Sequence, residues 1–183
     1  MSGFSLYKIS YTLSDDDYYD FNKYYVLSIP QQRRQLRAFR FGFPSISLVI
    51  MFIAIRSIWS SPHIYFIYAI IAGLSLAWII AFSRIIDFSM RRQIAKMKKQ
   101  GKVVYDKSVA LAFGESSFAE KTPESEAVIQ YTMLERIAET DKAIYLFARA
   151  NMAYIVPKRA FVSETEAAGF GEFIRSKVPT LEK

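Results

Sequence analysis

The distribution of apolar positions is most distinctive in the middle of the chain, where two apolar runs lie almost back to back. Residues 41–59 and 64–83 are separated only by Ser-Ser-Pro-His, and the second run contains no charged side chain. A helix of about 20 apolar residues can cross a hydrocarbon layer roughly 30 Å thick. The alternative is a buried hairpin of a soluble protein, but its helices would have polar faces, and the centres of these runs have none. The pattern predicts a two-span transmembrane hairpin.

The first run is uninterrupted only as far as Ile55. A span over residues 41–59 therefore requires Arg56 to extend toward the lipid head groups. An amphipathic basic segment leads into this run through Gly42 and Pro44, where we expect a bend at the membrane surface.

Small residues recur every four positions in the second run and so share one helix face, which lets another helix approach closely. The partner is either the first span of the same chain or a second copy of the chain, which would make a homo-oligomer. The residues of this small-residue face are Ala69, Gly73, Ala77 and Ala81.

The segment before the hairpin begins with alternating apolar and polar positions. Apolar side chains at Ile9, Tyr11 and Leu13 predict a half-buried strand. Ser14 can cap the helix that follows, and residues 15–17 are three aspartates in its first turn, where carboxylates are favoured. A metal site made from these aspartates is the sharper alternative.

The predicted amino-terminal helix has an aromatic side, for which core packing is the simpler interpretation. We expect the strand and helix to pack on the carboxy-terminal domain, because a strand needs a partner edge and both flanks of a hairpin emerge on one side. The residues of this side are Tyr18, Phe21, Tyr25 and Leu27.

Residues 103–183 have the pattern of a small α+β domain. Short candidate strands separated by turn-prone segments precede a final helix that Ser163 can cap. The outline is an antiparallel sheet closed by a carboxy-terminal helix. The predicted strands cover residues 108–114, 117–121, 127–133, 143–149 and 152–156.

The net charge of +7 is concentrated beside the apolar runs. Residues 84–102 carry seven basic groups and one acidic group, whereas residues 103–183 carry ten and twelve. Because cytoplasmic flanks of membrane spans accumulate Lys and Arg, we expect both termini in the cytoplasm. Nucleic-acid binding requires a basic folded domain, and here the domain is slightly acidic. The chain has no cysteine, which excludes disulfides and thiolate metal sites.

The basic residues after the second run are the clearest candidate binding surface. They could hold the helix on an anionic leaflet, only fix the topology, or pair with acidic residues of the domain. Further along, Lys158 and Arg159 either close a strand end or form an anion-binding corner. The basic surface consists of Arg84, Arg91, Arg92, Lys96, Lys98, Lys99 and Lys102.

Motifs for catalysis, cofactor binding and transport are missing from the sequence. It contains no glycine-rich phosphate loop, no Gly-x-Ser-x-Gly elbow and no histidine pair at metal spacing. The single histidine, His63, lies in the predicted external turn. The span centres carry no ionisable group of the kind that transporters use. We therefore expect a protein without cofactor that is not an enzyme.

Three segments carry a resemblance to a known family. These are residues 9–18, the Arg-Arg-Gln-Leu stretch at 33–36, and residues 153–161 with sequence Ala-Tyr-Ile-Val-Pro-Lys-Arg-Ala-Phe. With them the chain resembles bacterial YcxB-like membrane proteins over nearly its whole length, although Tyr131 stands where that family usually has Trp. The resemblance implies a pleckstrin-homology-like carboxy-terminal module and no established activity.

Together these observations predict an integral protein of the bacterial plasma membrane. Residues 1–40 form a cytoplasmic strand and amphipathic helices, residues 41–83 the hairpin, residues 84–102 a basic helix, and residues 103–183 the cytoplasmic domain. This domain would bind a protein partner or anionic lipid. The alternatives are a membrane-anchored enzyme of unknown type and a structural, oligomer-forming scaffold.

Overall fold

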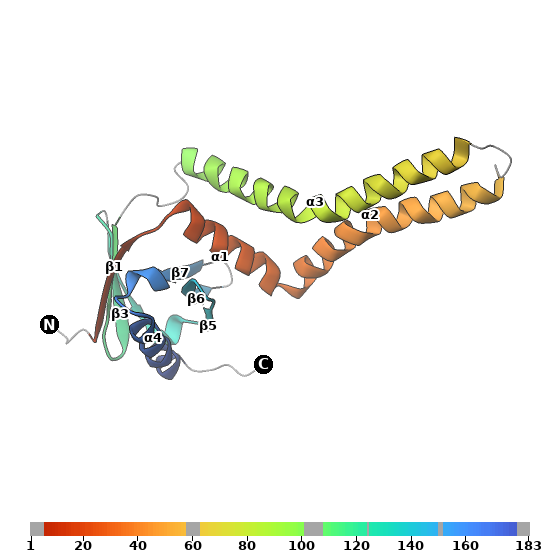
Figure 1. Cartoon of the computed structure of the whole chain (residues 1–183). Coiled ribbons are helices and arrows are strands. Elements are labelled where there is room, and N and C mark those ends of the chain that lie inside the picture. The colour runs from red at the N-terminus through yellow and green to blue at the C-terminus, as the bar shows by residue number, and fades with distance from the viewer. Residues whose placement is uncertain (1–5, 58–62, 101–107, 124, 150–151, 179–183) are drawn as a thin grey trace. The chain divides into compact units, whose positions relative to one another are not determined.

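The computed structural model describes residues 6–57, 63–100, 108–123, 125–149 and 152–178 (Figure 1). They form two compact units. The first, the sheet unit, combines residues 1–21 with residues 95–183, and the second, the helical unit, comprises residues 22–94. The predicted turn at residues 60–62 and the cation of Lys102 lie outside the described residues.

The sheet unit begins with a strand contributed by the amino terminus. β1 (Tyr7–Thr12) pairs antiparallel with β2 (Ser108–Phe113), and Ile9 stands opposite Leu111. Alternation places Ile9 and Tyr11 on the inner face, where they are 5% and 8% exposed. The prediction that this strand docks on the carboxy-terminal domain is confirmed.

Two antiparallel sheets make up the strands of this unit among the described residues. The first has the order β1-β2-β3-β4 and the second the order β5-β6-β7. The hydroxyl of Tyr11 in the first sheet donates a hydrogen bond of 2.6 Å to the carbonyl of Ile155 in the second. The remaining strands are β3 (Ser117–Lys121), β4 (Glu126–Gln130), β5 (Arg136–Glu139), β6 (Ala143–Arg149) and β7 (Met152–Pro157).

The strand expected over residues 127–133 is shorter in the structure. β4 ends at Gln130, and Tyr131–Met133 form the 3-10 turn η1. The Tyr131 side chain is 3% exposed and donates a hydrogen bond of 2.9 Å to the Gly114 carbonyl, and burial raises its pKa to about 12. Turning the chain here places this aromatic residue in the core.

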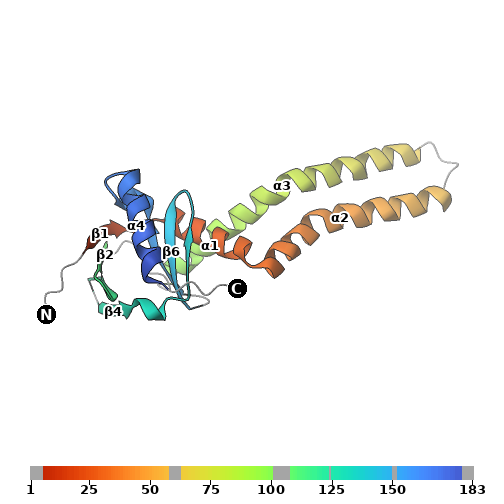
Figure 2. The same cartoon turned by 90° about the horizontal axis from the view of Figure 1, so that it is seen from below.

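The carboxy-terminal helix closes the core, as predicted. α4 (Glu164–Lys177), labelled in Figure 2, follows the short turn η2 (Lys158–Ala160). The Glu166 amide donates a hydrogen bond of 3.1 Å to the capping Ser163 hydroxyl. Phe170 and Ile174 on its inner face are fully buried among the strands.

The amino-terminal helix α1 (Asp15–Ser28) begins with the predicted cap. The Asp17 amide donates to the Ser14 hydroxyl at 3.2 Å, and the Ser14 amide donates to the Asp17 carboxylate at 2.7 Å. The aromatic stripe is confirmed in part, because Phe21 packs on Tyr145 with ring centroids 5.4 Å apart. Leu27 is 46% exposed, so the prediction of core packing is wrong there.

The helical unit is dominated by a hairpin of α2 (Pro30–Ser57) and most of α3 (His63–Lys99), which run side by side (Figures 1 and 2). α2 continues through Gly42 and Pro44 as one helix. Trp78 on α3 joins the two helices, because its indole nitrogen lies 3.4 Å from the Phe39 carbonyl and its ring lies 5.5 Å from the Phe43 ring.

Large apolar side chains cover the outside of this hairpin. Phe52, Phe66 and Leu74 are 67%, 70% and 65% exposed. Among the described residues, α2 and α3 are the two helices long and apolar enough to cross a membrane. The predicted architecture of two long apolar helices and a small antiparallel sheet domain with a carboxy-terminal helix is confirmed at this level.

Candidate functional site

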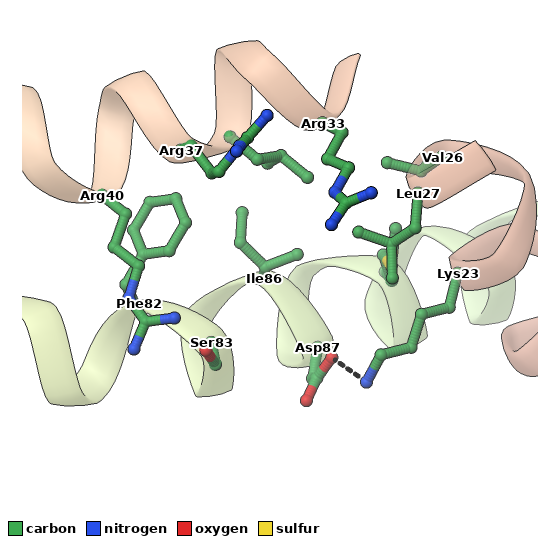
Figure 3. Close-up of a pocket in the computed structure, with 12 residues that line it drawn as sticks. Lys23, Val26, Leu27, Arg33, Arg37, Arg40, Phe82, Ser83, Ile86 and Asp87 are labelled. Atoms are coloured by element: carbon green, nitrogen blue, oxygen red, sulfur yellow. Dashed lines mark hydrogen bonds and ion pairs between the residues drawn. The ribbon is translucent and has the colours of Figure 1, made fainter. Parts of the chain in front are cut away.

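The helical unit contains a cavity between the amino-terminal part of α2 and the middle of α3 (Figure 3). Its volume is about 270 Å³. Sites that enclose whole small molecules measure roughly 300–1,000 Å³, so this cavity suits a smaller chemical group. The carboxy-terminal half of α1 closes one side of the cavity through Lys23, Val26 and Leu27.

Cations dominate the polar lining of the cavity. Arg33, Arg37 and Arg40 follow one face of α2 because they are spaced four and three residues apart. Lys23 adds a fourth cation, and its ammonium lies 3.0 Å from the Asp87 carboxylate. Asp87 is the one acidic residue of the lining, so four cations against one carboxylate leave an excess of three positive charges.

Within the described part of the chain, the three arginines differ from Lys23 in having no carboxylate partner. Among the described residues, no ion pair involves the guanidinium of Arg33, Arg37 or Arg40. Arg40 extends from α2 toward α3, and its Nε atom is buried without a hydrogen-bond partner (Figure 3). A buried N–H that belongs to a charged group is costly to leave unpaired. A hydrogen-bond acceptor placed beside Arg40 would satisfy this N–H.

The rest of the lining is apolar. Phe82, one turn from Trp78, is 8% exposed, and its ring lies 5.7 Å from the indole ring. Cations above an apolar floor match a ligand that is anionic at one end and apolar at the other. The apolar lining residues are Val26, Leu27, Leu36, Phe82, Ile86 and Met90.

Ion pairs occupy the corner of the sheet unit where an anion site was one of the two alternatives. The Lys158 ammonium lies 2.6 Å from the Glu139 carboxylate, which also pairs with Arg175. The hydrogen bond from Lys158, reinforced by the charges of Lys158 and Arg175, holds the pKa of Glu139 below its ordinary value. Lys158 therefore stabilises the contact between β5 and the segments that follow β7.

Arg159 is also engaged within the sheet unit. Its guanidinium pairs with Asp17 of α1 and donates a hydrogen bond of 3.2 Å to the Thr12 carbonyl. Lys158 and Arg159 line a common cavity, but Asp141 and Glu164 line it as well. The geometry supports the structural interpretation of these two residues over the anion-binding one.

The predicted basic surface lies along the carboxy-terminal part of α3, where its described cations are solvent-exposed. Lys98 is paired, since its ammonium lies 3.1 Å from the Asp15 carboxylate. The partner Asp15 belongs to the amino-terminal helix α1 and not to residues 103–183, so pairing of the cluster with the domain itself stays a prediction. The exposed residues are Arg84, Arg91, Arg92, Lys96, Lys98 and Lys99.

The small-residue face of α3 does not pack on the first span of the same chain. Ala69, Gly73 and Ala77 are exposed, Ala81 is half-buried, and a Cβ added at Gly73 would meet nothing within 4 Å. The buried positions of this part of α3 lie elsewhere on the helix, at Ser75 and Phe82, which are 6% and 8% exposed. The interpretation that this face packs on the first span is therefore wrong, and contact with a second copy of the chain stays a prediction.

The arginine cavity is the site that sequence reasoning missed. The basic segment before the first apolar run was not predicted to form a site, although the spacing of Arg33, Arg37 and Arg40 places them on one helix face. Ile86 and Met90 have the same spacing on α3. What the sequence could not provide was the pairing of these two faces across the hairpin.

Among the described residues, no group of three His, Asp or Glu side chains is placed to hold a metal ion. Asp15 and Asp17, two of the aspartates considered for such a site, pair with Lys98 and Arg159.

Comparison with known proteins identifies one segment of the chain. Neither the curated proteins nor the solved structures include a significant match. The model of the YcxB-like protein family matches residues 113–174, from the last residue of β2 into α4. The resemblance to this family is therefore confirmed over residues 113–174.

Proposed function

We propose that this chain is an integral protein of the bacterial plasma membrane that presents its YcxB-like domain on the cytoplasmic side. The protein engages anionic lipid of the cytoplasmic leaflet. The observation that carries the proposal is the apolar exterior of the hairpin, where Phe52, Phe66 and Leu74 are exposed over about two thirds of their surface. Soluble proteins rarely leave apolar patches this continuous exposed to water.

The distribution of charge supports the orientation. Arg33, Arg34 and Arg37 precede the apolar part of α2, and the exposed cations of α3 follow its apolar part. Lys and Arg collect on the cytoplasmic flanks of spans, and each contributes about 1 kcal/mol of attraction to an anionic leaflet.

A protein that binds the YcxB-like domain is the other class of partner considered. The arrangement of two antiparallel sheets closed by α4 supports a pleckstrin-homology-like module for it.

The orientation can be tested by thiol labelling, because the chain contains no cysteine. A Ser61→Cys variant places one thiol between the spans, and a Glu172→Cys variant places one on the exposed side of α4. In intact cells an impermeant maleimide should label the first variant and not the second. Permeabilised cells should show labelling of both. Labelling of Glu172→Cys from outside, or of neither variant in intact cells, contradicts the proposed topology.

A structural, oligomer-forming scaffold is the second candidate. The open space at Gly73 favours it, because small residues on a free face permit close helix contact. A Gly73→Leu variant should shift the protein from dimer to monomer in a mild detergent, with Gly42→Leu on α2 as the control; an unchanged mass of the detergent-solubilised protein contradicts this candidate.

A further inference from the structure

We propose that the arginine cavity of the helical unit binds the phosphate of an anionic phospholipid, with the glycerol and upper acyl carbons resting on its apolar floor. The inference rests on the proposed membrane placement and deepens it by assigning one discrete site. Arg33, Arg37 and Arg40 supply the phosphate contacts. Phe82 and Ile86 supply the surface for the apolar part.

The charge balance requires an anion of external origin. The lining holds four cations and one carboxylate, and that carboxylate is engaged with Lys23 at 3.0 Å. In the sheet unit, by contrast, Lys142, Lys158 and Arg159 each have an acidic partner. The arginines of the cavity repel one another unless an anion lies between them.

Arg40 makes the requirement more specific. Its buried Nε atom has no hydrogen-bond partner. Guanidinium groups bind phosphate oxygens through paired N–H donors, which a single water or chloride ion cannot match. A phosphate between α2 and α3 would satisfy this N–H and neutralise part of the excess charge together.

The apolar half of the lining distinguishes a lipid from a free phosphate. Leu36, Phe82 and Met90 offer nothing to an inorganic ion. The cavity volume of about 270 Å³ accommodates a phosphate with its glycerol but not a whole lipid. The acyl chains would continue along the exposed apolar surface of the hairpin, where Phe43 is 59% exposed.

The position of the cavity along the helices agrees with this occupant. Arg40 immediately precedes the apolar part of α2, and Phe82 lies where the apolar part of α3 gives way to Arg84. Tryptophan, arginine and lysine at such positions mark the level of the head groups. The phosphate of a lipid of the same leaflet lies at that level.

Trp78 allows the site to be tested in the full-length chain. It packs against Phe82 in the cavity lining, and a Trp59→Phe substitution leaves it as the single tryptophan. The protein is placed in nanodiscs of phosphatidylglycerol and phosphatidylcholine, with bromine on the upper acyl carbons of one lipid at a time. Bromine quenches tryptophan on contact. The quenching should report about fivefold enrichment of phosphatidylglycerol over its bulk fraction at Trp78.

The arginines of the cavity should account for that enrichment. An Arg33→Gln, Arg37→Gln, Arg40→Gln triple variant should show none. The charge-matched control, Arg84→Gln, Arg91→Gln, Arg92→Gln, removes three cations that do not line the cavity and should keep most of it. Arg40→Gln against Arg34→Gln repeats the comparison with single substitutions, and far-ultraviolet circular dichroism checks that each variant is folded.

Four outcomes overturn the assignment. Equal quenching by the two brominated lipids, or equal loss of preference in the two triple variants, leaves only diffuse attraction to the surface. Excess soluble glycerol phosphate that abolishes the preference assigns the cavity to a free phosphate ester. Retention of the preference by the cavity variant also overturns it. Thiol labelling of Ser61→Cys is independent of these results, so the membrane proposal can stand when the lipid site fails.

Discussion

The sheet unit and the helical unit differ in the burial of their apolar side chains and in the pairing of their cations. In the sheet unit, large apolar side chains such as Phe113 and Phe170 are fully buried, and Lys158, Arg159 and Lys142 pair with carboxylates. In the helical unit, Phe66 and Leu74 are exposed and the cavity arginines have no acidic partner among the described residues.

This difference separates residues that maintain a fold from residues that await a partner. A paired cation contributes little to binding because its partner must first be displaced. A cluster of unpaired cations can instead bind anions from the surroundings, and an apolar exterior can contact an apolar medium. The lipid bilayer supplies both an apolar medium and phosphate anions. For this reason we assign lipid binding to the helical unit.

The largest contrast is expected from removing one phenyl ring in each unit. Phe170 is fully buried and its ring lies 4.8 Å from that of Phe113, whereas Phe88 of α3 is 68% exposed. Phe170→Ala should lower the free energy of unfolding by about 3–5 kcal/mol because it leaves a cavity. Phe88→Ala should change it by less than about 0.5 kcal/mol. Urea denaturation of the full chain in micelles measures both; similar losses would erase the contrast.

A smaller effect is expected from the hydrogen bond that joins the two sheets. Tyr11→Phe removes the donor to the Ile155 carbonyl and leaves that acceptor unpaired in the core. The loss should be about 1–3 kcal/mol, and hydrogen exchange should accelerate in β1 and β7 together. Tyr65→Phe, at a tyrosine that is 64% exposed, is the matched control in the helical unit. Acceleration in β1 alone would mean that Tyr11 does not couple the sheets.

Removing single cations should separate paired from unpaired charges. Arg159→Gln breaks the ion pair with Asp17 and should cost at most about 1 kcal/mol, since half of the Arg159 side chain is exposed. Arg37→Gln should leave stability unchanged or raise it, because it relieves repulsion. A double-mutant cycle with Asp17→Asn measures the pair energy. A larger loss for Arg37→Gln than for Arg159→Gln would reverse the comparison.

The smallest effects are two opposite dependences on pH within the sheet unit. The pKa of Glu139 is lowered from 4.5 by Lys158, so the stability it contributes is complete above that value and is lost as pH falls through the lowered pKa. Burial raises the pKa of Glu120, so its carboxylate destabilises the fold as pH rises. Relative to wild type, Glu139→Gln should be less stable at pH 7, and Glu120→Gln more stable.

Both differences should shrink as the solution is acidified, which denaturation midpoints measured between neutral and acidic pH will show. Because the two variants remove the same charge, a common direction for both at pH 7 would show that the local surroundings of these carboxylates do not control their contribution.

Local patterns in the sequence predicted much of the fold. Ser14 and Ser163 mark helix starts through bonds to residues three positions later, and the alternation at Ile9 and Tyr11 identifies a strand. β5 was missed because it has four residues and only Ile137 and Ala138 are apolar. Tyr131 was placed in a strand because its turn depends on contacts with Gly114 and Ser116, which are distant in sequence.

The site was harder to predict than the fold for the same reason. The periodicity of Arg33, Arg37 and Arg40 was visible, but whether each cation has an acidic partner depends on tertiary contacts. The sequence left Lys158 and Arg159 open between a strand end and an anion-binding corner, and only the ion pairs with Glu139 and Asp17 favour the structural interpretation. Small residues on α3 likewise indicated close packing without indicating that the face would be open.

One measurement tests the contrast between the two units most directly. Hydrogen exchange by mass spectrometry compares the full chain in phosphatidylglycerol nanodiscs with the same chain in phosphatidylcholine nanodiscs. The account predicts slower exchange in residues 33–40 and 82–90 with phosphatidylglycerol, and unchanged exchange in β2 and β6. Equal protection of the cavity segments in the two lipids, or equal slowing in the strands of the sheet unit, would contradict it.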